Sequence, residues 1–164
     1  MVQGTSAENA TRPPEPIKYP RNIAFMVKVD KYFLRLFNCS MVGSAVTRLN
    51  GLPRVSSLIL ITKGRRTGRR IETPIYYFRD GKNFVVIGSK GGNPDHPAWI
   101  LNLEAYPDCQ IHVDWRTHNM RSRVAVGDER ARLWIKACDV FAPYADYQIF
   151  AGKREIPVVV LDER

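Results

Sequence analysis

Three short apolar runs with very short connections constrain the fold of this chain more than any other feature. The runs 57–62 (SLILIT), 73–78 (TPIYYF) and 84–88 (FVVIG) are rich in β-branched and aromatic residues, as strands are. Arg79-Asp80-Gly81-Lys82 joins the last two, and an Asp-Gly pair tolerates the positive φ angles of a tight hairpin. Strands joined by short turns run antiparallel. We therefore expect an antiparallel sheet at the centre of the fold.

Helices and further strands surround these runs. Residues 97–105 and 128–140 have helical patterns, because Pro97 is tolerated in a first helical turn and Asp128 is a candidate N-cap. Three other segments have the pattern of strands: 109–115, 121–126 and 156–161. The resulting order predicts an α+β fold, in which about six mostly antiparallel strands curl or close into a small barrel with flanking helices.

The first fifty residues divide near residue 20. Residues 1–20 are polar, contain four prolines and show no apolar period, so we expect a flexible tail followed by a single domain at 21–164. Apolar residues then recur at helical spacing, and this stripe comprises Ile23, Met26, Val29, Phe33, Leu36 and Phe37. Core packing is the favoured interpretation of the stripe. The alternative is a basic amphipathic helix on an anionic membrane surface.

Composition narrows the class of protein. Lys and Arg number 25 and Asp and Glu number 16, which gives a net charge of +9 with neutral histidines. That excess implies an anionic partner: nucleic acid, an acidic membrane surface or a phosphorylated small molecule. No stretch is long and apolar enough for a transmembrane span, and the first residues do not resemble a signal peptide. Three widely spaced cysteines fit neither a zinc site nor a disulfide framework, so we expect a cytosolic protein without a metal.

Residues 63–70 (KGRRTGRR), here called the basic turn, concentrate five cations between two predicted strands. Its two glycines let backbone N–H groups approach an anion, and arginine forks match phosphate and carboxylate groups. A solvated basic loop or a non-specific nucleic-acid patch explains the same charges. Charge alone does not separate these interpretations.

Residues 89–92 (SKGG), here called the SKGG loop, follow a predicted strand and precede the helix that begins near Pro97. Two glycines, a lysine and a helix N-terminus again form a corner that can receive an anion. Trp99 and Asn102 fall near one face of that helix. Trp99 is interpreted either as a core residue or as a platform for a planar ring. Two cationic glycine-containing corners beside an aromatic helix favour an elongated ligand with a ring and an anionic tail. Because the basic residues are bunched at turns, nucleic acid is disfavoured.

Longer motifs make the chain recognisable. TKGRRTGRRIETPIYYFRDG, IGSKGGNPDHPAWILNLEAYP and IPVVV resemble the deazaflavin-dependent nitroreductases, which are also described as F420H2-dependent quinone reductases. The resemblance covers roughly residues 24–162. It implies a split β-barrel related to FMN-binding barrels. It also implies binding of coenzyme F420, an 8-hydroxy-5-deazaflavin whose tail carries a phosphate and glutamates, and a cytoplasmic enzyme without a metal.

The same resemblance implies site residues by position. The implied coenzyme-binding residues are Lys63, Arg65, Arg66, Thr67, Gly68, Arg70, Pro74, Ser89, Lys90, Gly91, Ala98, Trp99 and Asn102. The chain departs from the family at Ile71, where an arginine is common. The implied catalytic residues are Tyr144, Ser89 and Tyr147, and Phe141 stands where a further tyrosine can occur.

The function implied is hydride transfer from reduced F420 to a planar conjugated acceptor: a quinone, an α,β-unsaturated ketone or lactone, or a nitroaromatic compound. A non-catalytic F420-binding protein and an FMN-dependent oxidoreductase on the same fold are the alternatives. A quinone dissolved in the bilayer would give the helix from Ile23 a role at the inner face of the cell membrane.

Overall fold

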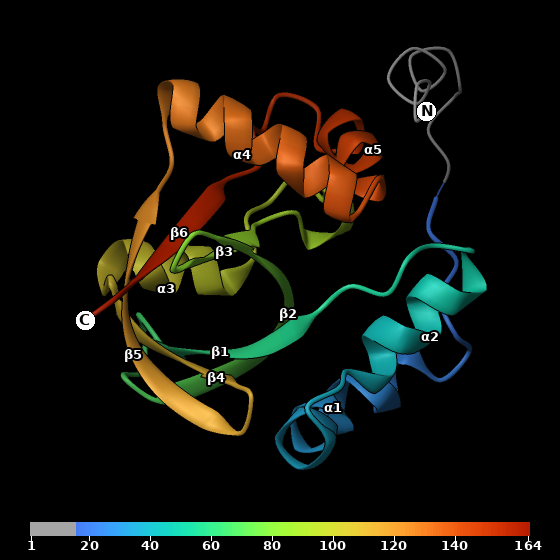
Figure 1. The fold of residues 1–164 in the computed structure, drawn as a ribbon, viewed down its shortest axis with the longest axis horizontal. Coiled ribbons are helices and arrows are strands. Elements are labelled where there is room, and N and C mark those ends of the chain that lie inside the picture. The colour runs from blue at the N-terminus through green and yellow to red at the C-terminus, as the bar shows by residue number, and fades with distance from the viewer. Residues whose placement is uncertain (1–15) are drawn as a thin grey trace.

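The structure is a computed structural model that describes residues 16–164, and it contains one β-barrel with helices packed around it (Figure 1). The strands are β1 (Ser57–Lys63), β2 (Arg70–Asp80), β3 (Asn83–Ile87), β4 (Asp108–Val113), β5 (Arg116–Val124) and β6 (Val158–Glu163). They close in the order β1-β2-β3-β6-β5-β4, and every neighbouring pair is antiparallel. The predicted α+β split-barrel class is therefore confirmed.

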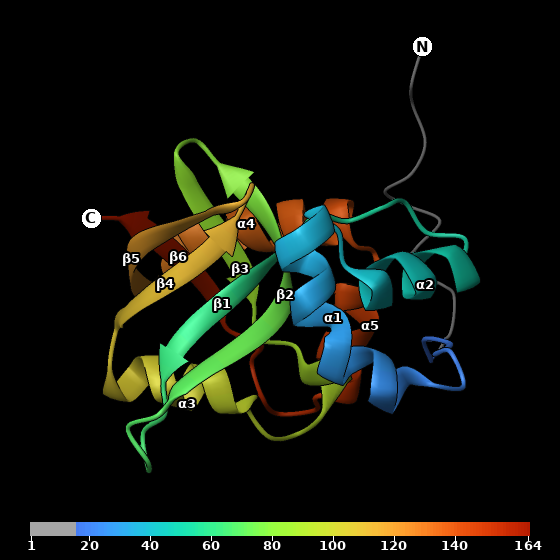
Figure 2. The ribbon, with the colours of Figure 1, turned by 90° about the horizontal axis from the view of Figure 1, so that it is seen from below.

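In the described part of the chain, five α-helices and one short 3-10 helix surround the barrel. They are α1 (Ile23–Phe37), α2 (Met41–Leu49), η2 (Lys90–Gly92), α3 (Ala98–Ala105), α4 (Gly127–Val140) and α5 (Pro143–Phe150). Helices α4 and α5 lie on one side of the barrel, α1 and α2 lie on another, and α3 lies across one end (Figures 1 and 2). No described helix is long and apolar enough to cross a membrane.

Strands β1, β3 and β6 are apolar on both faces because both of their faces are covered. Leu58 and Leu60 of β1 point into the barrel, where they pack with Trp99, Ile100 and Leu103 of α3. The outward faces of β3 and β6 pack against α4 and α5, and α1 covers β1. Period-two alternation therefore places one set of side chains inside the barrel and the other beneath helices.

The apolar stripe predicted from residue 23 is not buried along its whole length. Its last three members are exposed: Phe33, Leu36 and Phe37. The residue of this helix that enters the core is Leu34, which packs against β1, while the neighbouring Asp30 is also buried. Core packing was the wrong interpretation for this half of α1, because a different helix face is turned to the barrel.

The chain between residues 23 and 49 forms two helices where one apolar pattern was expected. Asn38 adopts a left-handed conformation (φ 48°) that ends α1, and Ser40 caps α2 by accepting a hydrogen bond from the N–H of Gly43 (2.7 Å).

The predicted tail is described only from residue 16, and residues 1–15 lie outside the described residues. Within the described part, the backbone N–H and carbonyl of Lys18 both hydrogen-bond to the side chain of Asn50, each at 2.9 Å. Residue 18 is thus docked on the C-terminal end of α2, which differs from the flexible segment expected up to residue 20.

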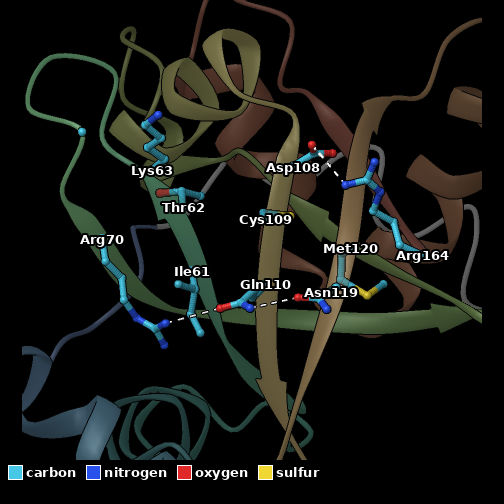
Figure 3. A pocket seen from close by; sticks show the side chains of 11 residues that line it. Ile61, Thr62, Lys63, Arg70, Asp108, Cys109, Gln110, Asn119, Met120 and Arg164 are labelled. Atoms are coloured by element: carbon cyan, nitrogen blue, oxygen red, sulfur yellow. Dashed lines mark hydrogen bonds and ion pairs between the residues drawn. The ribbon is translucent and has the colours of Figure 1, made fainter.

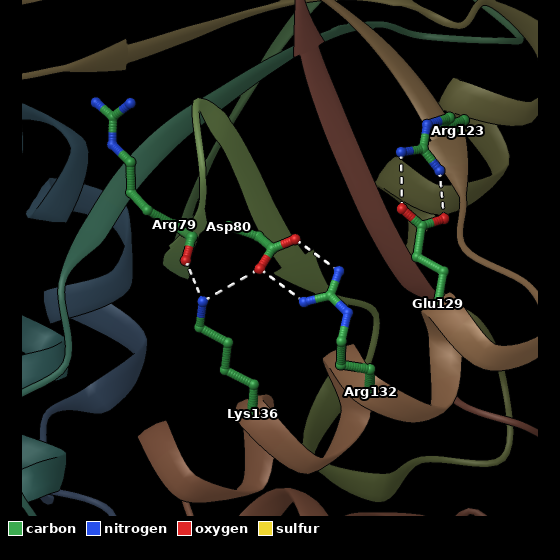
Figure 4. Close-up of polar contacts among 6 residues, drawn as sticks. All are labelled: Arg79, Asp80, Arg123, Glu129, Arg132 and Lys136. Atoms are coloured by element: carbon green, nitrogen blue, oxygen red, sulfur yellow. Dashed lines mark hydrogen bonds and ion pairs between the residues drawn. The ribbon is translucent and has the colours of Figure 1, made fainter.

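Ion pairs fasten α4 to the barrel (Figure 4). Arg132 binds Asp80 with two hydrogen bonds of 2.8 Å, and Lys136 contacts the same carboxylate at 3.2 Å. Arg123 of β5 pairs with Glu129 near the start of α4. That helix begins at Gly127 after Val126, so the prediction of Asp128 as its N-cap was wrong by two residues.

Candidate functional site

A pocket of about 230 Å³, here called the tyrosine pocket, lies between β2, the SKGG loop, α5 and the α1–α2 pair. Four aromatic rings form one wall: Tyr76 of β2, Phe141, and Tyr144 and Tyr147 of α5. Ring centroids lie 5.2 Å apart for Tyr76 and Phe141, and 5.1 Å apart for Phe141 and Tyr144. The rings meet in tilted or edge-on contacts, which hold this wall in one arrangement.

The phenol groups of this wall are held in their uncharged form. Burial raises the pKa of Tyr76 to about 12, and the carboxylate of Asp30 adds to the shift. Burial also raises the pKa of Tyr144, and it raises that of Tyr147 together with a hydrogen bond to Tyr19. All three hydroxyls therefore remain protonated at neutral pH and can act as hydrogen-bond or proton donors.

A buried carboxylate organises the opposite wall. Asp30 accepts hydrogen bonds from the hydroxyl of Ser40 (2.7 Å) and from the N–H groups of Met41 (2.6 Å) and Val42 (3.1 Å). It therefore satisfies the N-terminus of α2 and ties this helix to α1. Sequence reasoning missed Asp30, because one acidic residue in an apolar stripe resembles an exposed position.

Gly43 of α2 brings that wall close to the aromatic one. A Cβ atom at this position would lie 2.8 Å from the ring of Tyr76, and the hydroxyl of Tyr76 donates to the carbonyl of Gly43 (3.3 Å). A larger residue would displace the ring, so glycine is required for this contact.

The SKGG loop has an unusual backbone. Lys90, Gly91 and Gly92 all have positive φ angles, of 49°, 61° and 78°. Ser89 and Gly91 line the tyrosine pocket, whereas Lys90 is exposed. At Gly92 a Cβ atom would lie 2.7 Å from Cβ of Phe150 and 2.9 Å from the carbonyl oxygen of Tyr147. The loop consequently packs directly on α5, which fixes it beside the tyrosines.

Arg154, in the segment between α5 and β6, holds this loop in place. Its guanidinium donates to the carbonyl oxygens of Gly88 (2.9 Å), Ser89 (2.7 Å) and Asn93 (2.9 Å). One side chain thus fixes both ends of the SKGG loop. Sequence reasoning missed Arg154, since an arginine among other charged residues carries no signal when its partners are backbone carbonyls.

The basic turn is closed by its own backbone. The N–H of Gly64 donates to the carbonyl of Arg69 (2.8 Å), and the N–H of Gly68 donates to that of Gly64 (2.7 Å). Gly68 has a φ of 66°, a conformation that favours glycine. Ile71, where the family often has arginine, packs against Gly64.

Asn102 of α3 attaches the basic turn to the barrel. Its side-chain oxygen accepts from the N–H of Arg65 (3.1 Å), and its amide group donates to the hydroxyl of Thr62 (3.2 Å). Asn102 is 2% exposed and Trp99 is 6% exposed, with Trp99 packed inside the barrel. Both residues therefore support the site from beneath, and neither presents a ring-binding surface in this structure.

The cations of the turn differ in their surroundings. Arg70 pairs with Glu72 (3.1 Å), whereas Arg65, Arg66 and Arg69 have no ion pair among residues 16–164. Three guanidinium groups are thus available to an external anion.

The predicted site residues form two groups. The first lines the tyrosine pocket and comprises Pro74, Ser89, Gly91, Tyr144 and Tyr147. The second belongs to the basic turn and comprises Lys63, Arg65, Arg66, Thr67, Gly68 and Arg70. Ala98 is exposed at the start of α3. In the described part of the chain no three potential metal ligands cluster, and the absence of a metal stays a prediction.

Known proteins share both the sequence and the fold. The model of the F420H(2)-dependent quinone reductase family matches residues 34–163. F420H(2)-dependent quinone reductase Rv1261c of Mycobacterium tuberculosis is 38% identical over 120 residues, which cover 71% of this chain and 78% of that protein. A solved F420-H2 dependent reductase (FDR-A) is 28% identical with a TM-score of 0.60, over 65% of this chain and 93% of that chain.

A heme-binding protein of Mycobacterium smegmatis, 18% identical with a TM-score of 0.52 over 66% of this chain and 46% of that one, shares the fold alone. The family match spans the barrel, the basic turn, the SKGG loop and the tyrosines of α5. The chain therefore belongs to the F420H(2)-dependent quinone reductase family.

Proposed function

We propose that this protein passes a hydride from reduced F420 to a quinone or a related planar, conjugated acceptor. The observation that carries the proposal is the pairing of two features on one barrel. Three guanidinium groups of the basic turn have no ion pair in the described chain, and a pocket of the same barrel is lined by three protonated tyrosines. An anionic tail and a reducible ring need these two kinds of surroundings.

The residues present fit F420. The phosphate and glutamates of the coenzyme match Arg65, Arg66 and Arg69. A flat ring can approach the backbone at Gly91, which has no side chain of its own and whose nearest side-chain neighbour is the hydroxyl of Tyr19, 3.5 Å from where a Cβ atom would lie. Ser89 and Pro74 line the wall between the loop and β2. We infer that these residues hold the coenzyme, which supplies the hydride when bound.

The protein's own part in the reaction is positioning and proton supply. The hydroxyl of Tyr144 is buried and uncharged, so it can donate to the acceptor oxygen that gains negative charge. Ser89 and Tyr147 line the same pocket and can donate beside it. The apolar rings exclude water and favour a planar, apolar acceptor.

The acceptor class follows from the same wall. Quinones and α,β-unsaturated ketones or lactones place an oxygen where a tyrosine can donate. Phe141 contributes a ring without a hydroxyl, so we expect nitroaromatic compounds to be poorer acceptors than quinones.

Titration with oxidised F420, read by tryptophan quenching with FMN in parallel, tests the coenzyme assignment. Binding of F420 at micromolar concentration or below without FMN binding is expected. FMN binding alone would favour an FMN-dependent oxidoreductase. Binding of F420 without turnover on any acceptor would favour a carrier protein.

We further propose that the enzyme is cytoplasmic and touches the membrane through α1. Phe25 and Leu36 are 67% and 70% exposed, Phe37 is also exposed at the end of the same helix, and Lys28 adds positive charge. These side chains suit the interface of an anionic bilayer, from which an apolar quinone would enter. The double variant L36S/F37S should lose partition into anionic phospholipid vesicles. The control Ile135→Ser, an exposed apolar residue of α4 on the other side of the barrel, should retain it. Equal partition of the two variants would contradict the idea.

A further inference from the structure

Tyr19 is part of the tyrosine pocket although it precedes the first helix. It lines the pocket together with the tyrosines of β2 and α5, and the residue is 52% exposed. A residue that lines a pocket and is still half in solvent stands at the mouth of that pocket. Tyr19 also lies outside residues 34–163, which match the family model, so it is a feature of this chain that the family match does not cover.

Residues 16–20, here called the N-terminal strap, are fastened to the rest of the protein. The N–H of Lys18 donates to the side-chain oxygen of Asn50, and the side-chain nitrogen of Asn50 donates to the carbonyl of Lys18, each at 2.9 Å. Ile17 packs against the hydrophobic cluster that includes the tyrosine rings of α5. The strap then leads into α1. Tyr19 is therefore held at the mouth of the pocket by its neighbours in the chain.

The hydroxyl of Tyr19 connects α5 to the SKGG loop. It shares a hydrogen bond with the hydroxyl of Tyr147 on α5. The same oxygen lies 3.5 Å from the position of a Cβ atom on Gly91, so it covers a part of the loop that carries no side chain. The loop and α5 are themselves in direct contact at Gly92, which leaves the strap as the side of the mouth that can open.

The space behind Tyr19 is small. The pocket volume of about 230 Å³ is below the ~300–1,000 Å³ that is usual for small-ligand sites. A larger hollow of about 640 Å³ lies beside the basic turn, with Lys63 and Arg70 on one side and Arg164 on the other (Figure 3). Among the described residues, the two hollows share no lining residue. Tyr19 therefore limits the tyrosine pocket and leaves the larger hollow unaffected.

The tyrosine pocket continues on the side of α1. A hollow of about 420 Å³ between α1 and β2 shares Asp30, Val42 and Pro74 with it. An unbranched chain on an acceptor ring can extend into that hollow. A bulky group on the edge of the ring that faces Tyr19 meets the N-terminal strap instead.

We propose that Tyr19 is a specificity-determining residue, which closes the tyrosine pocket over a planar acceptor and excludes acceptors with bulky groups on both edges of the ring. The inference rests on the proposed function and adds a selection by size to it. The ring of Tyr19 fills the mouth, and its hydroxyl holds the ring in place through Tyr147. Compact quinones are then bound beneath the strap, whereas bulky quinones bind only when the strap is displaced.

The test compares duroquinone, a compact tetramethyl quinone, with a benzoquinone that carries two tert-butyl groups on opposite edges of its ring. Both are titrated by calorimetry into the full-length protein, with and without oxidised F420, so that affinity is measured without turnover. The parent should bind duroquinone about tenfold more tightly or better, because a hydrophobic pocket discriminates by ~10–200-fold against a single methylene group.

Tyr19→Ala should reduce this preference by about tenfold. Asn50→Ala removes both hydrogen bonds to Lys18 and leaves Tyr19 intact, so it should shift the preference in the same direction. Tyr19→Phe keeps the ring and loses only the hydrogen bond, so it should keep most of the preference. Tyr32→Ala is the matched control, because Tyr32 is a 57% exposed tyrosine of α1 that does not line the pocket.

Equal preference in the parent, Tyr19→Ala and Tyr32→Ala would overturn the selective role of Tyr19 and leave the proposed function standing. A changed F420 Kd in Tyr19→Ala without a changed quinone preference would also overturn it, because Tyr19 would then be a contact of the coenzyme. Failure of the parent to bind either quinone would overturn it as well. The expected shift in preference, combined with no oxidation of reduced F420 by duroquinone, would support the role of Tyr19 and contradict the proposed function.

Discussion

Replacement of Arg154 by methionine tests whether this side chain holds the SKGG loop of the proposed coenzyme site in place. The variant removes the three hydrogen bonds to the carbonyls of Gly88, Ser89 and Asn93 and keeps a side chain of similar length. Burial lowers the pKa of Arg154, although the group is still a cation at neutral pH.

The magnitude follows from the three bonds. Each contributes about 1 kcal/mol net, because the carbonyls are partly exposed and regain water when the guanidinium is lost. We expect the free energy of unfolding to fall by about 3 kcal/mol. If roughly half of that energy orders the SKGG loop for the coenzyme, the Kd for F420 rises about tenfold.

Urea unfolding and F420 titration of the same preparation measure both effects. Lys153→Met is the control, since it removes an equal charge from the exposed neighbouring position. Arg154→Lys should recover part of the stability, because one ammonium cannot span three carbonyls at separate positions. An Arg154→Met protein that matches Lys153→Met in both stability and Kd would refute the proposed role of the Arg154 guanidinium in holding the SKGG loop.

Three further predictions concern the aromatic wall, the loop contact and the ion pairs. Tyr144→Phe should slow quinone reduction by about 10²-fold with the F420 Kd unchanged, and an unaltered turnover rate would remove Tyr144 as a donor. Gly92→Ala should destabilise the fold by about 1–3 kcal/mol in thermal or urea unfolding, because the Cβ of the alanine would overlap Phe150. Stability equal to that of the parent would show that the loop can move to make room. The pKa of Asp80 is lowered from its ordinary value of about 3.9 to about 2, and the hydrogen bonds from Arg132 are the main cause. This group therefore adds stability above pH ~4 that is lost as the pH falls toward ~2. The difference in the free energy of unfolding between the parent and Asp80→Asn, measured with urea, should shrink over that interval. A difference that does not change with pH would contradict the ion pair's role.

The strands could be predicted because a buried strand is a short stretch rich in apolar residues. Both faces of β1 are covered, so residues 57–62 form an uninterrupted apolar run. The hairpin after Asp80 follows from Gly81, whose φ is 58°. By contrast, α5 escaped prediction because a helix of eight residues with apolar groups on several sides has little periodicity.

Candidate site residues could be named from the sequence where one residue type is concentrated, as at the arginines of the basic turn, and the family resemblance added the tyrosines of α5; their roles stay predictions. Site residues could not be named where the fold decides what a side chain meets. Asp30, Gly43 and Arg154 act on backbone groups and a ring from other elements, and such contacts leave no local signature. Trp99 is the opposite case: it belongs to the motif that carries the family resemblance, but its side chain packs in the barrel core.

Turnover of reduced F420 with a quinone tests the proposed reductase activity most directly. The purified protein is mixed with reduced F420 and a water-soluble quinone, and reappearance of the oxidised deazaflavin absorbance is followed, with reduced FMN as the competing donor. We predict protein-dependent oxidation of reduced F420 that saturates with quinone and is absent with reduced FMN. Tight binding of F420 without oxidation by any quinone would contradict a reductase.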